Sequence, residues 1–271
     1  PIIIMVVYAF STAAGDFTLE NFARMGTYTA VFTRSFKLAI IATLIALLIG
    51  YPVSYMLSKE GPQVQRIAMV LIMLPMWMNF LLRTYSWMSI LENNGLLNQL
   101  FQQIGLIDLY NQIAMHFASD PAAYVPIDHF QMIGTQGAVV LGMVYNYLPF
   151  MILPIYSVLV KLDHSLIEAA RDLGASSVQV FRKVILPLSL PGVLSGITMV
   201  FVPSVSTFAI SRLLGGGTQM MLGDLIEQQF LGGAYNPQLG AAIALVMMAI
   251  VVVCMLVMNR FGDGEEQAVM L

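Results

Sequence analysis

Charged side chains are scarce in this sequence. Of its 271 residues only 10% are Asp, Glu, Lys or Arg, whereas 58% are hydrophobic and the mean hydropathy is +0.80. A soluble domain averages about 25% charged residues, so 12 basic and 15 acidic side chains cannot cover a water-exposed surface over this length. Most of the surface must face lipid or other protein. The sequence therefore predicts an all-α, polytopic membrane protein.

Several functional classes are excluded by what the sequence lacks. Its one cysteine, Cys254, rules out an intramolecular disulfide and a cysteine-based metal site. A net charge of −3 offers no basic surface for nucleic acid. No G-x-x-x-x-G-K-[ST] sequence occurs, so the chain has no P-loop for ATP. A membrane-embedded protease would need H-E-x-x-H or paired intramembrane acids, and a secondary transporter would need intramembrane ionisable groups to carry a coupling ion. No H-E-x-x-H sequence occurs and no predicted span contains an acid, which counts against both classes. We predict no catalytic residue and no metal site.

Long apolar runs define the predicted membrane spans. A helix needs about 20 apolar residues to cross the hydrocarbon core, and five runs meet that length. A sixth run at the start of the sequence is shorter, and we interpret it as the outer half of a first span. The six spans are residues 1–10, 38–57, 67–91, 137–160, 188–211 and 239–258, in one transmembrane domain over residues 1–271. Within the third span lies Arg83, which we expect to reach outward to water or to pair with an acid such as Glu92.

The distribution of Lys and Arg predicts the orientation. With the connection 161–187 placed inside, seven basic residues are cytoplasmic and five are external. The connection 92–136 contains four acids, one of them Asp120, and no base, which is typical of an outer loop. Amphipathic pieces within it predict short helices lying on the outer face. Both termini are then cytoplasmic.

The cytoplasmic connection 161–187 reads as two short helices joined by an elbow. Capping patterns begin at Ser165 and at Ser176. Gly174 stands where a left-handed residue would end the first helix, and Pro187 is expected to end the second. Such a pair could be a rigid knob that docks in a partner's groove, or an amphipathic loop on the membrane surface. Secondary structure alone leaves both interpretations open.

The residues of this connection resemble a known motif. Glu168-Ala169-Ala170, Gly174 six positions after Glu168, and Leu186-Pro187 together resemble the EAA loop of ABC importer permeases, with Val184 where that family usually has Ile. The resemblance implies a coupling helix that docks in a cleft of a separate nucleotide-binding subunit. The coupling residues it implies are Glu168, Ala169, Ala170, Arg171, Asp172, Gly174 and Ala175.

Further motifs narrow the resemblance to the spermidine/putrescine importer permeases. The Gly-Tyr-Pro end of the second span resembles the PotB-type branch of that family. These motifs are Gly50-Tyr51-Pro52, Leu74-Pro75-Met76-Trp77, Arg83-Thr84-Tyr85-Ser86-Trp87, Asn94-Gly95-Leu96-Leu97-Asn98, Tyr147-Leu148-Pro149-Phe150-Met151, Pro154-Ile155-Tyr156 and Leu213-Leu214-Gly215-Gly216. The resemblance implies a polyamine permease of the bacterial inner membrane that is not itself an enzyme. It implies no cofactor in this chain, with ATP and Mg on a partner ATPase dimer. The other implied partners are a second, PotC-type permease and an extracytoplasmic polyamine-binding protein.

Candidate substrate-pathway residues are polar or aromatic and lie in the outer halves of the spans or just beyond them. They are Trp77, Tyr85, Trp87, Glu92, Tyr145, Asn146, Tyr147, Ser204, Ser206, Thr207, Asp224 and Glu227. Carboxylates match the ammonium groups of a polyamine, and aromatic faces attract cations. Each has a plainer interpretation: Trp and Tyr as interfacial belt residues, Ser and Thr as groups bonded to their own helix, and the two acids as groups that contact a partner or water.

The transported solute has an alternative assignment. The same architecture serves permeases for ferric iron, sulfate, molybdate or phosphonate, although an oxyanion pathway should favour basic donors.

Gly192-x-x-x-Gly196 is a close-packing motif of membrane helices. It could pack against another span of this chain or against a second permease.

Overall fold

The computed structural model describes residues 2–117 and 125–269, so Asp120 of the predicted outer loop lies outside the described residues. In this part the chain is helical, apart from one isolated bridge between Ser11 and Phe17. The helices are α1 (Ile2–Ala9), α2 (Glu20–Arg24), α3 (Thr29–Ser58), α4 (Pro62–Trp77), α5 (Phe80–Leu91), α6 (Leu96–Gln103), α7 (Leu106–Phe117), α8 (Gln136–Leu159), α9 (His164–Asp172), α10 (Ser177–Val180), α11 (Leu186–Ser206), α12 (Ala209–Leu214), α13 (Leu222–Leu231) and α14 (Pro237–Val269). A 3₁₀ turn (Met25–Tyr28) precedes α3 and a π turn (Phe181–Ile185) precedes α11.

Among the described residues, four helical stretches are long and apolar enough to cross a membrane, or five if the bent pair α4–α5 is one span. Three of the predicted spans fall within or almost within α3, α8 and α14, and a fourth begins within α11. The short α1 packs against the start of α14 through Ala9, Ala241 and Ala242, all fully buried. This position agrees with α1 being the outer part of a further span.

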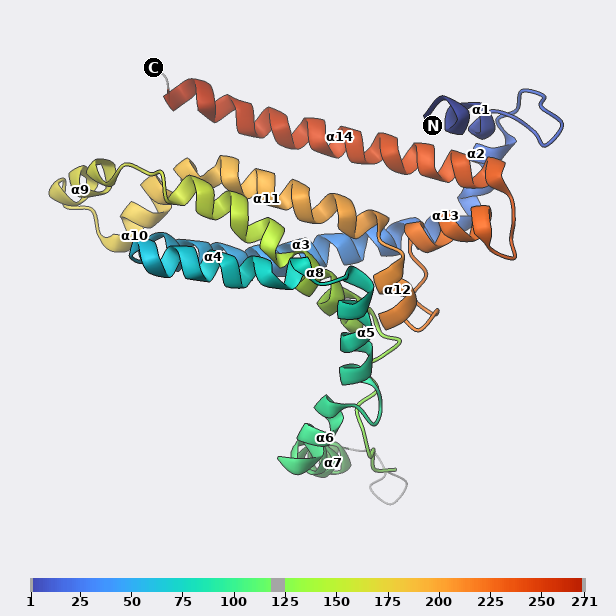
Figure 1. The fold of residues 1–271 in the computed structure, drawn as a ribbon, viewed down its shortest axis with the longest axis horizontal. Coiled ribbons are helices and arrows are strands. Elements are labelled where there is room, and N and C mark those ends of the chain that lie inside the picture. Colours follow the sequence, from blue (N-terminus) through green and yellow to red (C-terminus); the bar gives the residue numbers. More distant parts are fainter. Residues whose placement is uncertain (1, 118–124, 270–271) are drawn as a thin grey trace.

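The centre of the bundle is formed by α3, α8 and α11, which lie side by side (Figure 1). Glycines bring their backbones close together. A Cβ on Gly192 would lie 2.8 Å from the carbonyl oxygen of Pro154, and one on Gly196 would lie 2.8 Å from the sulfur of Met151. Both contacts are with α8 of the same chain. The Gly192–Gly196 motif is therefore an internal helix contact, which decides between the two alternatives for it.

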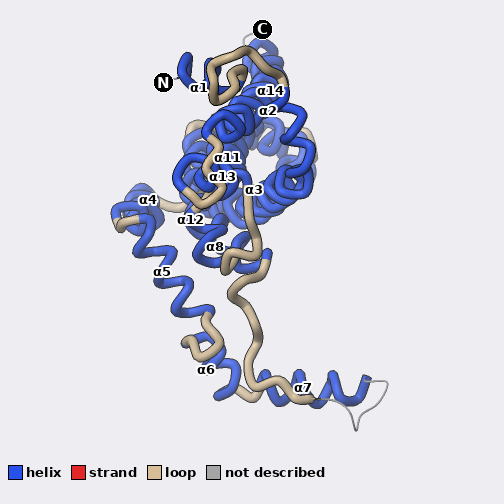
Figure 2. Tube along the Cα trace, turned by 90° about the vertical axis from the view of Figure 1, so that its right-hand side faces the viewer, coloured by secondary structure: helices blue, strands red, loops and turns tan. Residues whose placement is uncertain are grey.

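The predicted third span, residues 67–91, is not one straight helix. The axis turns by 89° between α4 and α5. Met78 has an extended backbone (φ −76°, ψ 147°), and the Asn79 side chain accepts hydrogen bonds from the amides of Leu81 and Leu82 and so starts a new helix. As a result α5, α6 and α7 form an arm that leaves the bundle sideways (Figures 1 and 2).

Arg83 is also placed differently from the prediction. Its side chain is buried, with 8% of the residue exposed, where α5 packs against α12. Its Nε and Nη1 have no acceptor within the described residues. Glu92 follows the far end of α5, about 13 Å away at a rise of 1.5 Å per residue. The prediction that Arg83 reaches outward or pairs with Glu92 is wrong, because the turn at Met78 directs α5 along α12.

The fifth predicted span, residues 188–211, differs at both ends. Its helix is continuous from Ser177 to Ser206, so Pro187 does not end a helix as predicted. Proline is tolerated there because it lies just after the π turn Phe181–Ile185, and such a local change of the helix satisfies the backbone groups that a proline leaves without a partner. At the other end Thr207 is extended (ψ 141°), and the chain begins the separate helix α12.

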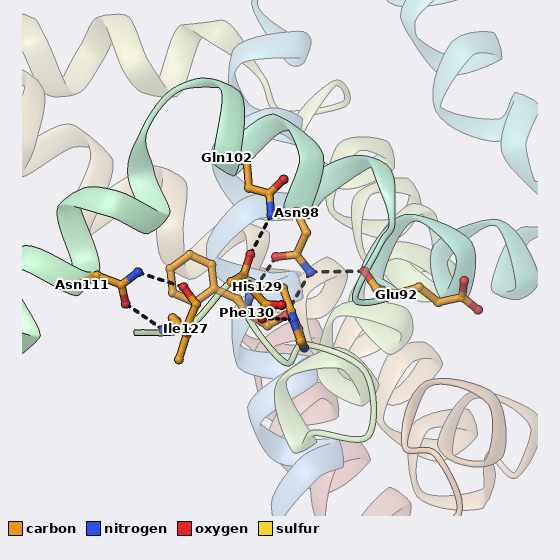
Figure 3. A network of polar contacts seen from close by, with 8 residues as sticks. Glu92, Asn98, Gln102, Asn111, Ile127, His129 and Phe130 are labelled. Carbon is orange, nitrogen blue, oxygen red and sulfur yellow. Dashed lines mark hydrogen bonds and ion pairs between the residues drawn. The ribbon is translucent and has the colours of Figure 1, made fainter. Parts of the chain in front are cut away.

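Short helices in the predicted outer loop are confirmed as α6 and α7, and amide side chains hold the returning segment against them (Figure 3). Asn98 donates to the carbonyls of Glu92 and Phe130 and accepts from the Phe130 amide. The Asn111 side chain donates to the Ile127 carbonyl and accepts from the Ile127 amide. These bonds satisfy backbone groups in an extended segment that has no strand partner.

Candidate functional site

The helix pair α9–α10 projects from one end of the bundle, opposite α13 (Figure 1). Asp163 caps α9 by accepting from the Ser165 amide at 2.9 Å, so the cap predicted at Ser165 is wrong by two residues. Gly174 has φ +82°, as predicted for a left-handed residue that ends the first helix. The second cap is confirmed, since Ser176 and Gln179 form a reciprocal capping box. The connection is a folded helix–elbow–helix unit.

Most of the predicted coupling residues lie on the surface of this unit. The exposed ones are Glu168, Ala169, Arg171, Asp172 and Gly174, and the half-buried ones are Ala170 and Ala175. Apolar side chains are exposed beside them, with Leu173 at 89% and Val178 at 74%. Apolar groups left open beside charges are typical of a surface that a partner protein covers.

An aromatic contact ties the helix pair to the bundle. Phe181 of the π turn meets the rings of Tyr51 and Tyr55 on α3 edge-on, at centroid distances of 5.9 and 5.4 Å. The Lys59 ammonium lies 3.8 Å above the Tyr55 ring. Tyr51 also shares a 2.8 Å hydrogen bond with Ser189 of α11. The helix pair is therefore anchored on α3 through Phe181, and α3 is hydrogen-bonded to α11 through Tyr51.

At the opposite end, α12 and α13 bring two of the predicted pathway acids together. Asp224 is 6% exposed and accepts from the Ser211 hydroxyl at 2.5 Å and from the Met221 amide at 2.9 Å. Glu227, one helical turn later, accepts from Arg212 Nη1 at 2.8 Å on both carboxylate oxygens. A cavity of about 220 Å³ lies against these groups.

Burial raises the pKa of the Asp224 carboxyl above its usual value of 3.8, although its two hydrogen bonds oppose the shift. The folded chain therefore binds this proton more tightly than the unfolded chain. The carboxyl stabilises the fold fully below pH 3.8, and this contribution is lost as the pH rises through the folded-state pKa.

Asp224→Asn is expected to reduce the pH dependence of the stability of the fold. The amide oxygen of Asn still accepts from Ser211 and Met221, but the amide group does not titrate. Thermal unfolding of the purified protein between pH 4 and pH 7 would measure it. The variant should gain stability relative to wild type as the pH rises. Asp108→Asn on α7 removes an exposed acid and is the matched control. A constant difference between Asp224→Asn and wild type over this range would contradict the assignment.

The other predicted pathway residues fall into three groups. Trp87 and Tyr145 meet edge-on at 5.3 Å, and the Tyr147 hydroxyl contacts Thr207. The hydroxyls of Ser204 and Ser206 bond to carbonyls of their own helix, which agrees with their plainer interpretation. The remaining side chains are not brought together: Trp77, Tyr85 and Glu92 are exposed, and Asn146 is buried with no donor to its Oδ1 in the described residues.

Sequence analysis missed several residues that organise these sites. Ser211 and Arg212 hold the two acids of α13, and the contact of Phe181 with the two tyrosines supports the helix pair. No spacing signal links them, because each contact joins two separate elements and depends on how those elements pack. Within residues 2–117 and 125–269, no three His, Cys, Asp or Glu side chains gather as a metal site would need.

The long apolar helices, with an exposed helix pair at one end, define the class of protein, a polytopic helical membrane protein. A family model described as "binding-protein-dependent transport system inner membrane component" matches residues 1–264. The chain belongs to this family. It is therefore a multi-pass transport subunit of the inner membrane, in a class of transport system that requires a binding protein.

Among its relatives is the spermidine/putrescine transport system permease protein PotB of Escherichia coli K12, 36% identical over 246 residues, which cover 90% of this chain and 82% of that protein. The Haemophilus influenzae protein of the same name is 35% identical over 263 residues, covering 93% of this chain and 85% of its own. The E. coli inner membrane ABC transporter permease protein YdcU is 28% identical over 234 residues, which cover 86% of this chain and 71% of that protein.

Solved structures share the fold. A bacterial ABC transporter involved in import of the polysaccharide alginate matches with a TM-score of 0.75 and 14% identity, covering 96% of this chain and 88% of the other. The MetNI methionine ABC transporter matches with a TM-score of 0.56 and 19% identity, and the match covers 91% of this chain and 98% of the other. At these identities the likeness supports the ABC importer permease fold alone.

Proposed function

We propose that this chain is the PotB-type permease subunit of an ATP-driven importer of spermidine and putrescine. The observation that carries the proposal is the identity of 35–36% to permeases of that name over about 90% of the chain. The carboxylates at the α13 end support a cationic substrate, because they can bind ammonium groups.

In this proposal the α9–α10 end is cytoplasmic and docks on a separate ATPase dimer, which binds ATP and Mg. The far end of α14 is cytoplasmic as well, and the α13 end, beside which α1 lies, faces a polyamine-loaded binding protein (Figure 1). A PotC-type permease supplies the second half of the pathway. When the ATPase dimer closes, it displaces the helix pair, and the contact of Phe181 with Tyr51 and Tyr55 passes this movement to α3 and α11. The bundle then switches between outward and inward openings.

The substrate assignment is tested by reconstituting the complex in lipid with its binding protein. ATP hydrolysis should increase when the binding protein carries spermidine or putrescine, and should stay at its basal rate with sulfate. Stimulation by sulfate alone, or by neither polyamine, would overturn the polyamine assignment.

A further inference from the structure

A cavity between α12 and α13 contains the most concentrated polar chemistry at this end of the described chain. It is lined by Ser211, Arg212, Gly217, Met220, Asp224, Glu227 and Gln228. A larger hollow of about 840 Å³ opens between α1, α2 and the loop before α14, but a single carboxylate, Glu20, lines it, whereas Asp224 and Glu227 both line the cavity between α12 and α13.

The contact between Arg212 and Glu227 has an unusual geometry. A guanidinium normally binds a carboxylate with two parallel N–H groups, whereas here the single nitrogen Nη1 lies 2.8 Å from both carboxylate oxygens. A primary ammonium, which is a compact point charge with three donors, can take the same position. Arg212 therefore occupies the place that an alkylammonium group would fill.

This ion pair can be exchanged. The Arg212 side chain is 56% exposed and that of Glu227 is 26% exposed, so water screens their attraction and the pair is weak. Asp224, in contrast, is fixed by Ser211 and Met221 and keeps a second carboxylate beside the cavity. When one cation replaces another on Glu227, the carboxylate is never left bare, so the exchange avoids the cost of an unpaired charge.

Resting on the proposed transport function, we propose that this cavity is a transient binding site for one ammonium group of a diamine or polyamine, and that Arg212 is an internal competitor which the substrate displaces from Glu227. The displaced guanidinium swings into solvent. A neutral solute cannot replace it, and an anion is repelled by Asp224 and Glu227. The site thus selects cations after delivery by the binding protein.

The test measures spermidine transported per ATP hydrolysed in proteoliposomes that contain the whole complex and its binding protein. Glu227→Gln should lower this ratio about tenfold, the effect of losing a charge-assisted hydrogen bond. Arg212→Gln removes only the competitor and should keep the ratio at or above the wild-type value when spermidine is limiting. Glu20→Gln breaks the other Arg–Glu pair at this end and should behave as wild type.

Opposite effects of Glu227→Gln and Arg212→Gln distinguish a role in substrate binding from a purely structural role of the ion pair. If the pair merely held α12 to α13, both substitutions would break it and would lower the ratio alike, which would overturn the inference. A wild-type ratio in Glu227→Gln would also overturn it. If the wild-type complex transports no polyamine at all, the proposed function has failed instead, and the two failures are distinguishable.

Discussion

Gly174→Pro is expected to abolish substrate uptake while the protein remains in the membrane. Gly174 has φ +82°, whereas the proline ring fixes φ near −65°. Proline also removes the amide that donates to the Arg171 carbonyl at 2.8 Å. No atom lies within 4 Å of a Cβ at this position, so the loss arises from backbone geometry rather than from a clash. The elbow must open, and α9 then leaves the orientation in which we propose that it docks on the ATPase.

Uptake of labelled substrate and the membrane content of the protein are the two measurements. Gly61→Pro is the matched control, because Gly61 lies in the α3–α4 connection and its φ of −68° already suits proline. Gly174→Ala should be intermediate, since a left-handed conformation costs a non-glycine residue about 1–2 kcal/mol. Wild-type uptake in Gly174→Pro would contradict the coupling role.

A charge reversal tests the same surface without touching the backbone. Glu168 is exposed on α9, so Glu168→Lys should leave the fold intact and place a cation against the partner's docking cleft. We expect loss of uptake and loss of substrate-stimulated ATP hydrolysis, because like or unpaired charges across an interface are costly. Stimulated hydrolysis at the wild-type level would contradict this expectation.

The conformation of the connection 161–187 could be predicted well from sequence because its signals are local. Gly174 and the capping box of Ser176 and Gln179 act over a few residues, and the structure places both as expected. The cap of α9 was placed at Ser165 rather than Asp163, because several polar residues precede that helix and each is a competent cap.

The arm and the α12–α13 site could not be predicted, for a different physical reason. Residues 67–91 contain no charged residue except Arg83, and hydropathy does not record a turn of the helix axis. The turn depends on the extended Met78 and on capping by Asn79. Arg212 and Glu227 are 15 residues apart on two short helices, and only the packing of those helices brings them into contact.

Gly192→Ala is expected to destabilise the contact between α8 and α11 more than Gly196→Ala does. The new Cβ would lie 2.8 Å from the Pro154 carbonyl oxygen and 3.1 Å from the Ile155 Cα, both backbone atoms of α8. No change of rotamer relieves such contacts, so α8 and α11 must move apart. Overpacking of this kind costs about 1–3 kcal/mol, and a membrane helix contact is sensitive to it because close approach of backbones is what stabilises it.

Two further variants set the scale, with thermal unfolding of the purified protein and its abundance in membranes as the measurements. Gly196→Ala should cost less, since its shortest contact, 2.8 Å, is with the flexible sulfur of Met151, although the Met151 carbonyl follows at 3.1 Å. Gly26→Ala meets no atom within 4 Å and should be nearly neutral. The expected order of destabilisation is therefore Gly192, Gly196, Gly26. Equal stability of the Gly192 and Gly26 variants would mean that α8 and α11 are free to separate, and would contradict an internal role for the Gly192–Gly196 motif.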